Sequence, residues 1–149
     1  MDIKKQISDA AHESYYAYDI NCANTTLNIL SELFHQPIHK QVTAAAAGMH
    51  GAGGFRAQCG LVEGALMFIG IFFAEKNMPE EDIISLCYDF GESFTEKFGS
   101  LRCYDLRPGG FRDDDPPHLC EDFSVRAIYF SYEFVLRALN HFGAAADNE

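Results

Sequence analysis

Cysteine is the residue type in this chain with the most reactive side chain, and its placement suggests a chemistry. Four of the five cysteines lie near the expected starts of helices, namely Cys22, Cys59, Cys103 and Cys120. Free backbone N–H groups and the helix dipole at such positions favour the thiolate over the thiol. Because thiolates attack disulfides and bind metal ions, the pattern predicts redox or metal chemistry for these four residues.

The fifth cysteine, Cys87, is expected to pack in the core instead. It falls in the middle of a predicted helix, on one face with Ile83, Gly91 and Phe94. A small apolar side chain suits such a face. Unreactive packing is also the alternative for the other four cysteines, although their shared position near helix starts weakens it.

In a dithiol mechanism, one thiolate attacks a disulfide and a second cysteine resolves the mixed disulfide. Cys59 is the preferred attacking sulfur, because a glycine-rich loop and a helix start give it access and N–H donors. Glu63, four residues later on the same helix face, is a candidate to relay its proton. The charge of Glu63 would also oppose thiolate formation, and a solvated position is the alternative. The expected partner is a redox protein or a small-molecule thiol or disulfide.

Metal binding is the second chemical interpretation. Four thiolates from Cys22, Cys59, Cys103 and Cys120 would complete a tetrahedral zinc site or hold an iron–sulfur cluster. These cysteines are separated by 37, 44 and 17 positions, however, and the sequence has no Cys-x-x-Cys pair. His118 would extend such a site, with a surface position as its alternative. The cofactor therefore stays open between none, zinc and an iron–sulfur cluster.

A noncatalytic helical interaction module is the alternative from a different class. The chain has 13 phenylalanines, so an exposed aromatic face would allow a homodimer to form. The formal charge of -11 and the pI of about 4.8 would repel phosphate backbones and anionic lipid headgroups. We therefore expect neither nucleic acid nor a membrane as partner.

Two segments bear on the location of the protein. The apolar stretch 61–74 is too short to cross a bilayer comfortably and carries Glu63. Residues 1–13 are polar and charged, without the apolar core of a secretory signal. Both observations predict a cytoplasmic protein, in which structural disulfides are not expected.

The elements that would position the cysteines are all helices, since no long run of residues alternates with the period of two typical of strands. Hydrophobic spacing and capping residues predict main helices over residues 2–18, 22–34, 55–77, 79–98 and 117–142. A short helix is expected at 42–47 and a short turn at 101–106. We therefore predict one all-α domain over residues 1–149, a bundle of about five main helices.

Three segments are expected to be irregular: the glycine-rich residues 48–54, the segment 99–117 with Pro108, and a frayed tail over 143–149. The spacing of Gly60 and Gly64 should let a neighbouring backbone approach closely. One face of the helix over 79–98 is expected to point inward: Ile83, Ile84, Cys87, Tyr88, Gly91, Phe94 and Phe98.

Residues 59–66, with the sequence CGLVEGAL, resemble the CGAxxG signature of the putative redox-active proteins named for a C_GCAxxG_C_C cysteine pattern. The other cysteines of the predicted set follow the order of that family across nearly the whole chain. The resemblance implies that these four are the family's signature cysteines and that Cys87 is not. It implies redox chemistry without naming a reaction, so whether the chain is an enzyme stays open. Leu61 and Glu63 depart from the family's pattern.

Overall fold

The computed structural model describes residues 2–107 and 109–147, with side chains through residue 145. Across this part of the chain every regular element is a helix, and the isolated bridge between Gln58 and Arg102 forms no strand. The predicted all-α class is therefore confirmed. The elements in chain order are α1 (Ile3–Tyr16), α2 (Cys22–Phe34), α3 (Lys40–Ala45), the 3-10 turn η1 (Ala46–Gly48), α4 (Gly51–Gly54), α5 (Gly60–Ala74), α6 (Glu80–Phe98), α7 (Cys103–Leu106) and α8 (Glu121–Asp147).

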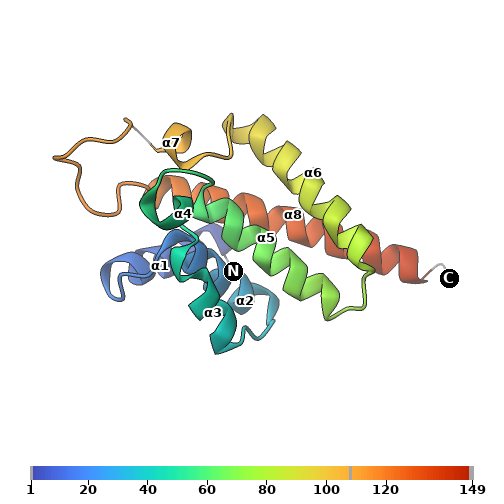
Figure 1. Ribbon diagram of the computed structural model, residues 1–149. Helices are drawn as coiled ribbons and strands as arrows, with labels where there is room; N and C mark the ends of the chain where they lie inside the picture. The colour runs from blue at the N-terminus through green and yellow to red at the C-terminus, as the bar shows by residue number, and fades with distance from the viewer. Residues whose placement is uncertain (1, 108, 148–149) are drawn as a thin grey trace.

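The long helices α1, α2, α5, α6 and α8 form the body of the protein. The prediction of about five helices is slightly low, because the short helices α3, α4 and α7 add to them. Figure 1 shows α8 running along the length of the molecule, with α5 and α6 alongside it and α1 to α3 gathered near one end. Contacts with α2, α6 and α8 place α5 at the centre of the bundle.

Asn21 defines the start of α2 and ties it to its surroundings. Its side-chain oxygen accepts a hydrogen bond from the Asn24 backbone N–H at 2.8 Å, which caps the helix. Its amide nitrogen donates to the carbonyl oxygens of Ala46 and Ala47, at 3.1 and 2.9 Å. The first turn of α2 is thus held against η1, and the predicted bounds 22–34 are confirmed.

Two glycines of α5 allow α2 to pack closely against it. A Cβ atom added at Gly60 would lie 2.9 Å from the Cys22 Cβ. One added at Gly64 would lie 2.5 Å from the Ala23 carbonyl oxygen. Real Cβ atoms do not approach other atoms this closely, so a side chain does not fit at either position. The close approach expected at this glycine pair is confirmed, and it brings the start of α5 next to Cys22.

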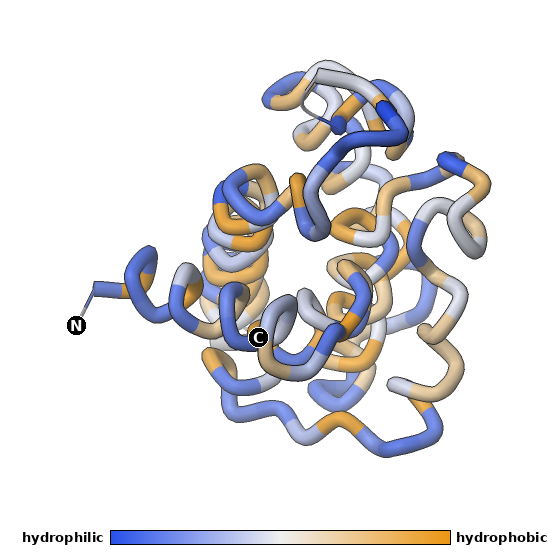
Figure 2. The backbone as a smooth tube through the Cα atoms, turned by 90° about the vertical axis from the view of Figure 1, so that its left-hand side faces the viewer, coloured by the Kyte–Doolittle hydropathy of each residue, from blue (hydrophilic) through white to orange (hydrophobic). Residues whose placement is uncertain are grey.

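The core is rich in phenylalanine. Figure 2 shows hydrophobic segments concentrated in the packed helices and many hydrophilic segments along the outer loops. Phe90 of α6 packs against Phe130 and Phe134 of α8, with ring centroids 5.8 and 5.2 Å apart. Phe98 packs on Phe123 at 5.2 Å, near the start of α8. These aromatic contacts hold α6 against α8.

The predicted inward face of α6 is wrong at two positions. Ile84 is 61% exposed and Tyr88 is 71% exposed, whereas Phe90 and Phe94 are fully buried. The buried stripe is centred on these two phenylalanines because the rings of α8 cover that side of α6. Cys87 lies at the edge of the stripe and is half-buried.

α5 begins later than predicted, at Gly60 rather than near residue 55. Backbone hydrogen bonds pair residues 56–59 with residues 101–104, so the residues before Gly60 do not join the helix. Cys59 consequently caps α5 instead of lying in its first turn. The glycine-rich loop also contains one distorted helical turn, α4, where no regular element was expected.

α8 extends beyond its predicted end near Phe142. The helix continues through Gly143 to Asp147, so the expected fraying from residue 143 is wrong for the part of the tail that the structure describes. Three consecutive alanines after Gly143 explain the extension, because alanine has the highest helix propensity. The predicted breaker Pro108 and residues 148–149 of the tail lie outside the described residues.

The apolar helix α5 has 15 residues, whereas about 20 are needed to span the hydrocarbon layer. Within residues 2–107 and 109–147, no helix is long and apolar enough to cross a bilayer.

Candidate functional site

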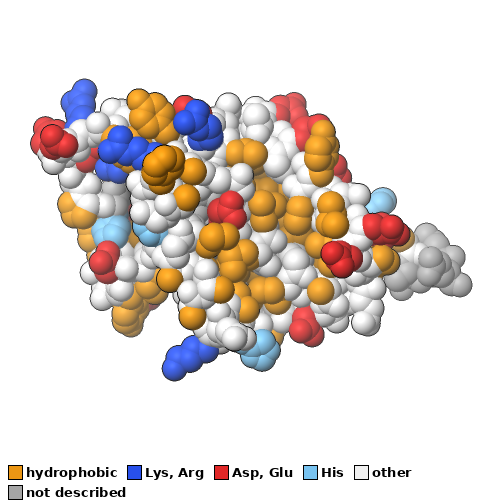
Figure 3. Space-filling view, in the orientation of Figure 1, with side chains coloured by type: hydrophobic (Ala, Val, Ile, Leu, Met, Phe, Trp, Pro, Cys, Tyr) orange, Lys and Arg blue, Asp and Glu red, His pale blue; other side chains and the backbone are white. Residues whose placement is uncertain are grey.

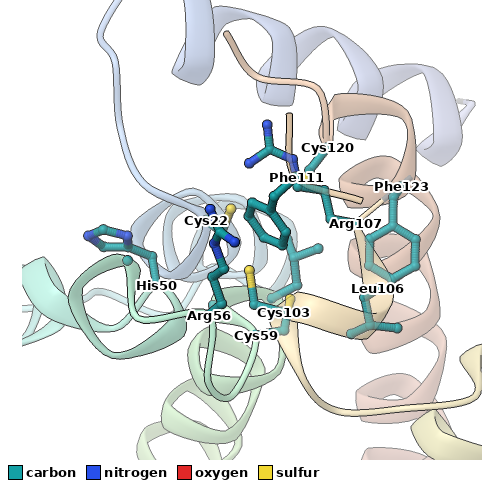
Figure 4. A pocket seen from close by; sticks show the side chains of 13 residues that line it. Cys22, His50, Arg56, Cys59, Cys103, Leu106, Arg107, Phe111, Cys120 and Phe123 are labelled. Atoms are coloured by element: carbon teal, nitrogen blue, oxygen red, sulfur yellow. The ribbon is translucent and has the colours of Figure 1, made fainter. Parts of the chain in front are cut away.

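One cavity of about 350 Å³ brings together the four cysteines of the predicted set. Cys22, Cys59, Cys103 and Cys120 all line it, although they come from four separate segments of the chain (Figure 4). Each stands at or directly before the start of a helix, near the starts that the sequence predicted. Cys120 precedes α8 rather than lying in its first turn, because α8 begins at Glu121 and not near residue 117. We call this space the cysteine cavity. It is the feature around which the starts of α2, α5, α7 and α8 are arranged.

Backbone pairing positions Cys59 and Cys103. The Cys59 N–H donates to the Leu101 carbonyl oxygen at 2.8 Å, and the Cys103 N–H donates to the Ala57 carbonyl oxygen at 2.7 Å. Gly51 lies next to this paired backbone. Its φ is +68°, a conformation that favours glycine. A Cβ atom at Gly51 would lie 3.3 Å from the Cys103 Cβ. The glycine-rich loop therefore leaves room for Cys103 at the cavity wall.

Tyr15 connects the cavity to α1 and α8. Its buried hydroxyl group is 2.7 Å from the Ser124 Oγ, which in turn donates to the Cys120 carbonyl oxygen at 2.8 Å. Burial raises the pKa of the Cys22 thiol, and hydrogen bonding with Tyr15 partly offsets that effect. Tyr15 thus reaches both Cys22 and the segment that carries Cys120.

Burial favours the neutral thiols, contrary to the expectation that helix starts would favour thiolates. Burial raises the pKa of Cys59 to about 12 and the pKa of Cys120 to about 11. The negative charge that a Cys22 thiolate would carry is a smaller contribution to both of these increases. Backbone N–H groups at the start of α5 lower the pKa of Cys59, but by less than desolvation raises it.

Cys103 has surroundings that are more favourable to a thiolate. Burial raises its pKa as well, but the positive charges of Arg107 and Arg56 lower it. Cys103 is also partly exposed, whereas Cys59 is only 6% exposed. Access and charge therefore favour Cys103 over Cys59, the sulfur that sequence analysis preferred, as the first to react.

The two arginines of the cavity and the phenylalanine between them were not predicted from the sequence. The guanidinium carbon atoms of Arg56 and Arg107 lie 3.9 and 4.4 Å from the centroid of the Phe111 ring. The sequence contained a signal for the arginines, namely their spacing from the cysteines: Arg56 precedes Cys59 by three residues, and Arg107 follows Cys103 by four. Phe111 lies in the irregular segment and had no such signal.

Three residues considered with the site lie outside the cavity lining. Glu63 accepts a hydrogen bond from the Gln58 side chain, which does not support its expected role as a proton relay for Cys59. His118 stacks on Tyr15, with ring centroids 5.1 Å apart. Cys87 lines a separate groove between α5 and α6. The structure thus separates Cys87 from the other four cysteines.

Zinc or an iron–sulfur cluster would need the four sulfurs as closely grouped ligands. In the part of the chain that the structure describes, no three His, Cys, Asp or Glu side chains are grouped closely enough to hold a metal ion. The residue types suit these metals, but their arrangement does not form a ready metal site. Metal binding would require the sulfurs to move closer together.

The raised pKa of Cys59 predicts a distinctive pH dependence for its alkylation. With a pKa of about 12, its thiolate fraction at pH 8 is on the order of 10⁻⁴. The rate with iodoacetamide should therefore rise about tenfold per pH unit from pH 8 to beyond pH 10. Cys103 should react faster than Cys59 throughout this range, because it is more exposed and lies near two arginines.

Peptide mass spectrometry after timed quenching measures both rates, and circular dichroism at each pH checks that the fold persists. The pH at which the rate levels off reports the pKa, independently of how easily the reagent reaches the sulfur. A Cys59 rate that levels off near pH 8 or 9 would contradict the effect assigned to burial.

Comparison with known proteins agrees with the cysteine pattern. The family model described as "Putative redox-active protein (C_GCAxxG_C_C)" matches residues 20–134, a range that contains all four cysteines of the cavity. No curated protein and no solved structure gives a significant match. Since the family model covers most of the sequence, the chain belongs to the C_GCAxxG_C_C family of putative redox-active proteins.

Proposed function

We propose that the protein carries out thiol–disulfide exchange, with the four cysteines of the cavity acting as two dithiols. One observation supports this most strongly: four cysteines that are far apart in the sequence line a single cavity, while Cys87 lies elsewhere. Unreactive packing alone would not require the four to share one cavity. The family's redox description points to the same chemistry.

In the proposed reaction, Cys103 loses its proton and its thiolate attacks one sulfur of a disulfide substrate. A bond forms between Cys103 and that sulfur, the substrate's S–S bond breaks, and the other half leaves as a thiolate that takes up a proton. Arg56 and Arg107 favour this step because their charges stabilise the attacking thiolate. The product at this stage is a mixed disulfide on Cys103.

Cys59 is the proposed resolving cysteine. A negative charge on Cys103 raises the pKa of Cys59, and the mixed disulfide removes that charge. Formation of the mixed disulfide therefore makes Cys59 easier to ionise. Its thiolate attacks the Cys103 sulfur, releases the second half of the substrate as a thiol, and leaves a Cys59–Cys103 disulfide.

Cys22 and Cys120 form the second proposed dithiol. Tyr15 and Ser124 connect the two segments that carry them, and a charge on Cys22 raises the pKa of Cys120. A charge on Cys103 also raises the pKa of Cys22, so these two sulfurs are neighbours.

The Cys22 thiolate attacks the Cys103 sulfur of the Cys59–Cys103 disulfide, and Cys120 then resolves the resulting Cys22–Cys103 bond, which returns Cys59 and Cys103 to thiols. Cys103 can then attack a second substrate disulfide, so each dithiol gives two electrons to one substrate disulfide and every substrate reacts at Cys103. An external dithiol, protein or small molecule, would return both pairs to the thiol form by the reverse exchange.

A stoichiometric oxidation tests the proposal. The fully reduced protein, freed of reductant under anaerobic conditions, is mixed with excess bis(2-hydroxyethyl) disulfide, a small neutral substrate. We expect four of the five protein thiols to be lost and two disulfides to be reduced per chain, because each dithiol reduces one disulfide. Thiol titration of the protein and of the filtrate measures both numbers.

The Cys87→Ser variant is the matched control. It should lose the same four thiols and leave none, since Cys87 lies in a separate groove. Loss of no thiols in the native protein, or loss of Cys87 together with the others, would contradict the proposed function.

A further inference from the structure

The charges around the cysteine cavity differ in sign from those of the chain as a whole. The sequence has 22 acidic and 11 basic residues, which gives a formal net charge of -11. Among the described residues that line the cavity, however, the side chains with a full charge are Arg56 and Arg107, and none is Asp or Glu. On the face drawn in Figure 3, most Lys and Arg side chains lie at the end of the molecule that carries α7 and the loop after it, with Asp and Glu side chains beside them. The cavity is therefore locally positive in an acidic protein.

The arrangement of the two arginines leaves donor groups for a ligand. Both guanidinium groups lie next to the Phe111 ring, which supports them by cation–π contact (Figure 4). Arg107 makes one long ion pair, 3.3 Å from the Asp115 carboxylate, and its Nε atom is buried without a hydrogen-bond partner among the described residues. A guanidinium that lies against a ring keeps its N–H edges available for a carboxylate.

The size of the cavity limits what it admits. Its volume of about 350 Å³ is near the lower end of the range for small-molecule sites, which is about 300–1,000 Å³. A small disulfide fits this range better than a folded protein surface. The apolar rings of Phe111 and Phe123 suit the aliphatic part of such a molecule.

We propose that the substrate is a small disulfide that carries carboxylate groups, held by Arg56 and Arg107 with its sulfur atoms directed toward Cys103. This substrate class rests on the thiol–disulfide function proposed above. The arginines then have two roles: they bind the carboxylates of the substrate, and they favour the thiolate of the attacking cysteine. The preference for an anion is opposite to what the net charge of the chain would produce.

Equilibrium binding to the Cys103→Ser variant tests the preference without turnover. Three probes of similar size are compared by calorimetry at pH 7: dithiodiglycolate, which carries two carboxylates, bis(2-hydroxyethyl) disulfide, which is neutral, and cystamine, which carries two amines. We expect dithiodiglycolate to bind at least about tenfold more tightly than the other two, because hydrogen bonds to charged groups contribute at least that much.

Charge-removing variants assign the effect to the two arginines. In the Cys103→Ser background, Arg56→Gln and Arg107→Gln should each reduce the affinity for dithiodiglycolate about tenfold and leave that for the neutral probe unchanged. Arg137→Gln is the matched control, because Arg137 is exposed on α8 and does not line the cavity. Circular dichroism of each variant checks that it is folded.

The outcomes separate the two proposals. If dithiodiglycolate binds no more tightly than cystamine, the substrate class is wrong, while reduction of the neutral disulfide by the native protein would still support the proposed function. If the native protein fails to reduce the neutral disulfide, the proposed function is wrong, and the binding comparison still decides whether the cavity prefers carboxylates.

Discussion

Replacement of Cys103 by serine should abolish disulfide reduction by this protein, with a loss of at least about 1,000-fold in the single-turnover rate, as is typical when a nucleophile is removed. A serine hydroxyl group cannot form the mixed disulfide, and the two arginines beside Cys103 would no longer have a thiolate to stabilise. The measurement is the release of thiol from bis(2-hydroxyethyl) disulfide by reduced protein under anaerobic conditions.

Two other cysteine variants make this test specific. Cys59→Ser should still react once but stop at the mixed disulfide, which mass spectrometry would find on Cys103. Cys87→Ser makes the same chemical change in the groove between α5 and α6 and should keep the native rate. Native rates in Cys103→Ser, together with complete loss in Cys59→Ser, would show that Cys59 is the attacking sulfur and that the structure-based order is wrong.

The second large effect concerns the helix crossing that positions the site. Gly64→Ala should lower the free energy of unfolding by about 2 kcal/mol, because overpacking a tight core contact typically costs about 1–3 kcal/mol. The added Cβ atom would lie 2.5 Å from the Ala23 carbonyl oxygen and 2.9 Å from the Thr26 Cβ. The first of these neighbours is backbone of α2, so the clash is relieved only by moving α2 away from α5.

Gly70→Ala on the same helix is the matched control. A Cβ atom at Gly70 would meet nothing within 4 Å, so this change should stabilise the protein by up to about 1 kcal/mol through helix propensity. Urea unfolding under reducing conditions, followed by circular dichroism, measures both variants. Equal stabilities for the two variants would contradict close packing at Gly64.

The sequence was most informative where a single local interaction determines the structure. Asn21 caps α2 at the start expected from the sequence, residue 22, and Gly99 ends α6 with a φ of +91°. The Gly60 and Gly64 pair correctly indicated a close helix crossing. These features depend on neighbouring residues or on one short spacing, which a sequence shows directly.

The sequence was least informative where distant segments meet. Residues 56–59 pair with residues 101–104 through backbone hydrogen bonds. This pairing delays the start of α5 and places Cys59 and Cys103 on adjoining backbone. The composition of the two segments does not predict that they pair. The exposure of Ile84 and Tyr88 was missed for a related reason. Hydrophobic spacing identifies an apolar stripe, but the phenylalanines of α8 decide which part of that stripe is covered.

For the candidate site, too, some features could be predicted from the sequence and others could not. The positions of the four cysteines near helix starts could be predicted, and so could the separate position of Cys87. Their ionisation could not, because it depends on burial and on the approach of other charged groups. Desolvation raises the pKa of Cys59, while Arg56 and Arg107 lower that of Cys103, and both effects arise only in the folded chain.

Disulfide mapping of the oxidised protein tests most directly whether the four cysteines form one redox site. Reduced protein is oxidised with a small disulfide, its free thiols are blocked, and the linked peptides are identified by mass spectrometry, with metal and sulfide analysis of the same sample. We expect metal-free protein with a Cys59–Cys103 and a Cys22–Cys120 disulfide, a blocked Cys87, and complete return to five thiols on reduction. Stoichiometric zinc or iron with all four cavity cysteines protected from oxidation would contradict the dithiol function, and disulfides that include Cys87 would contradict the site.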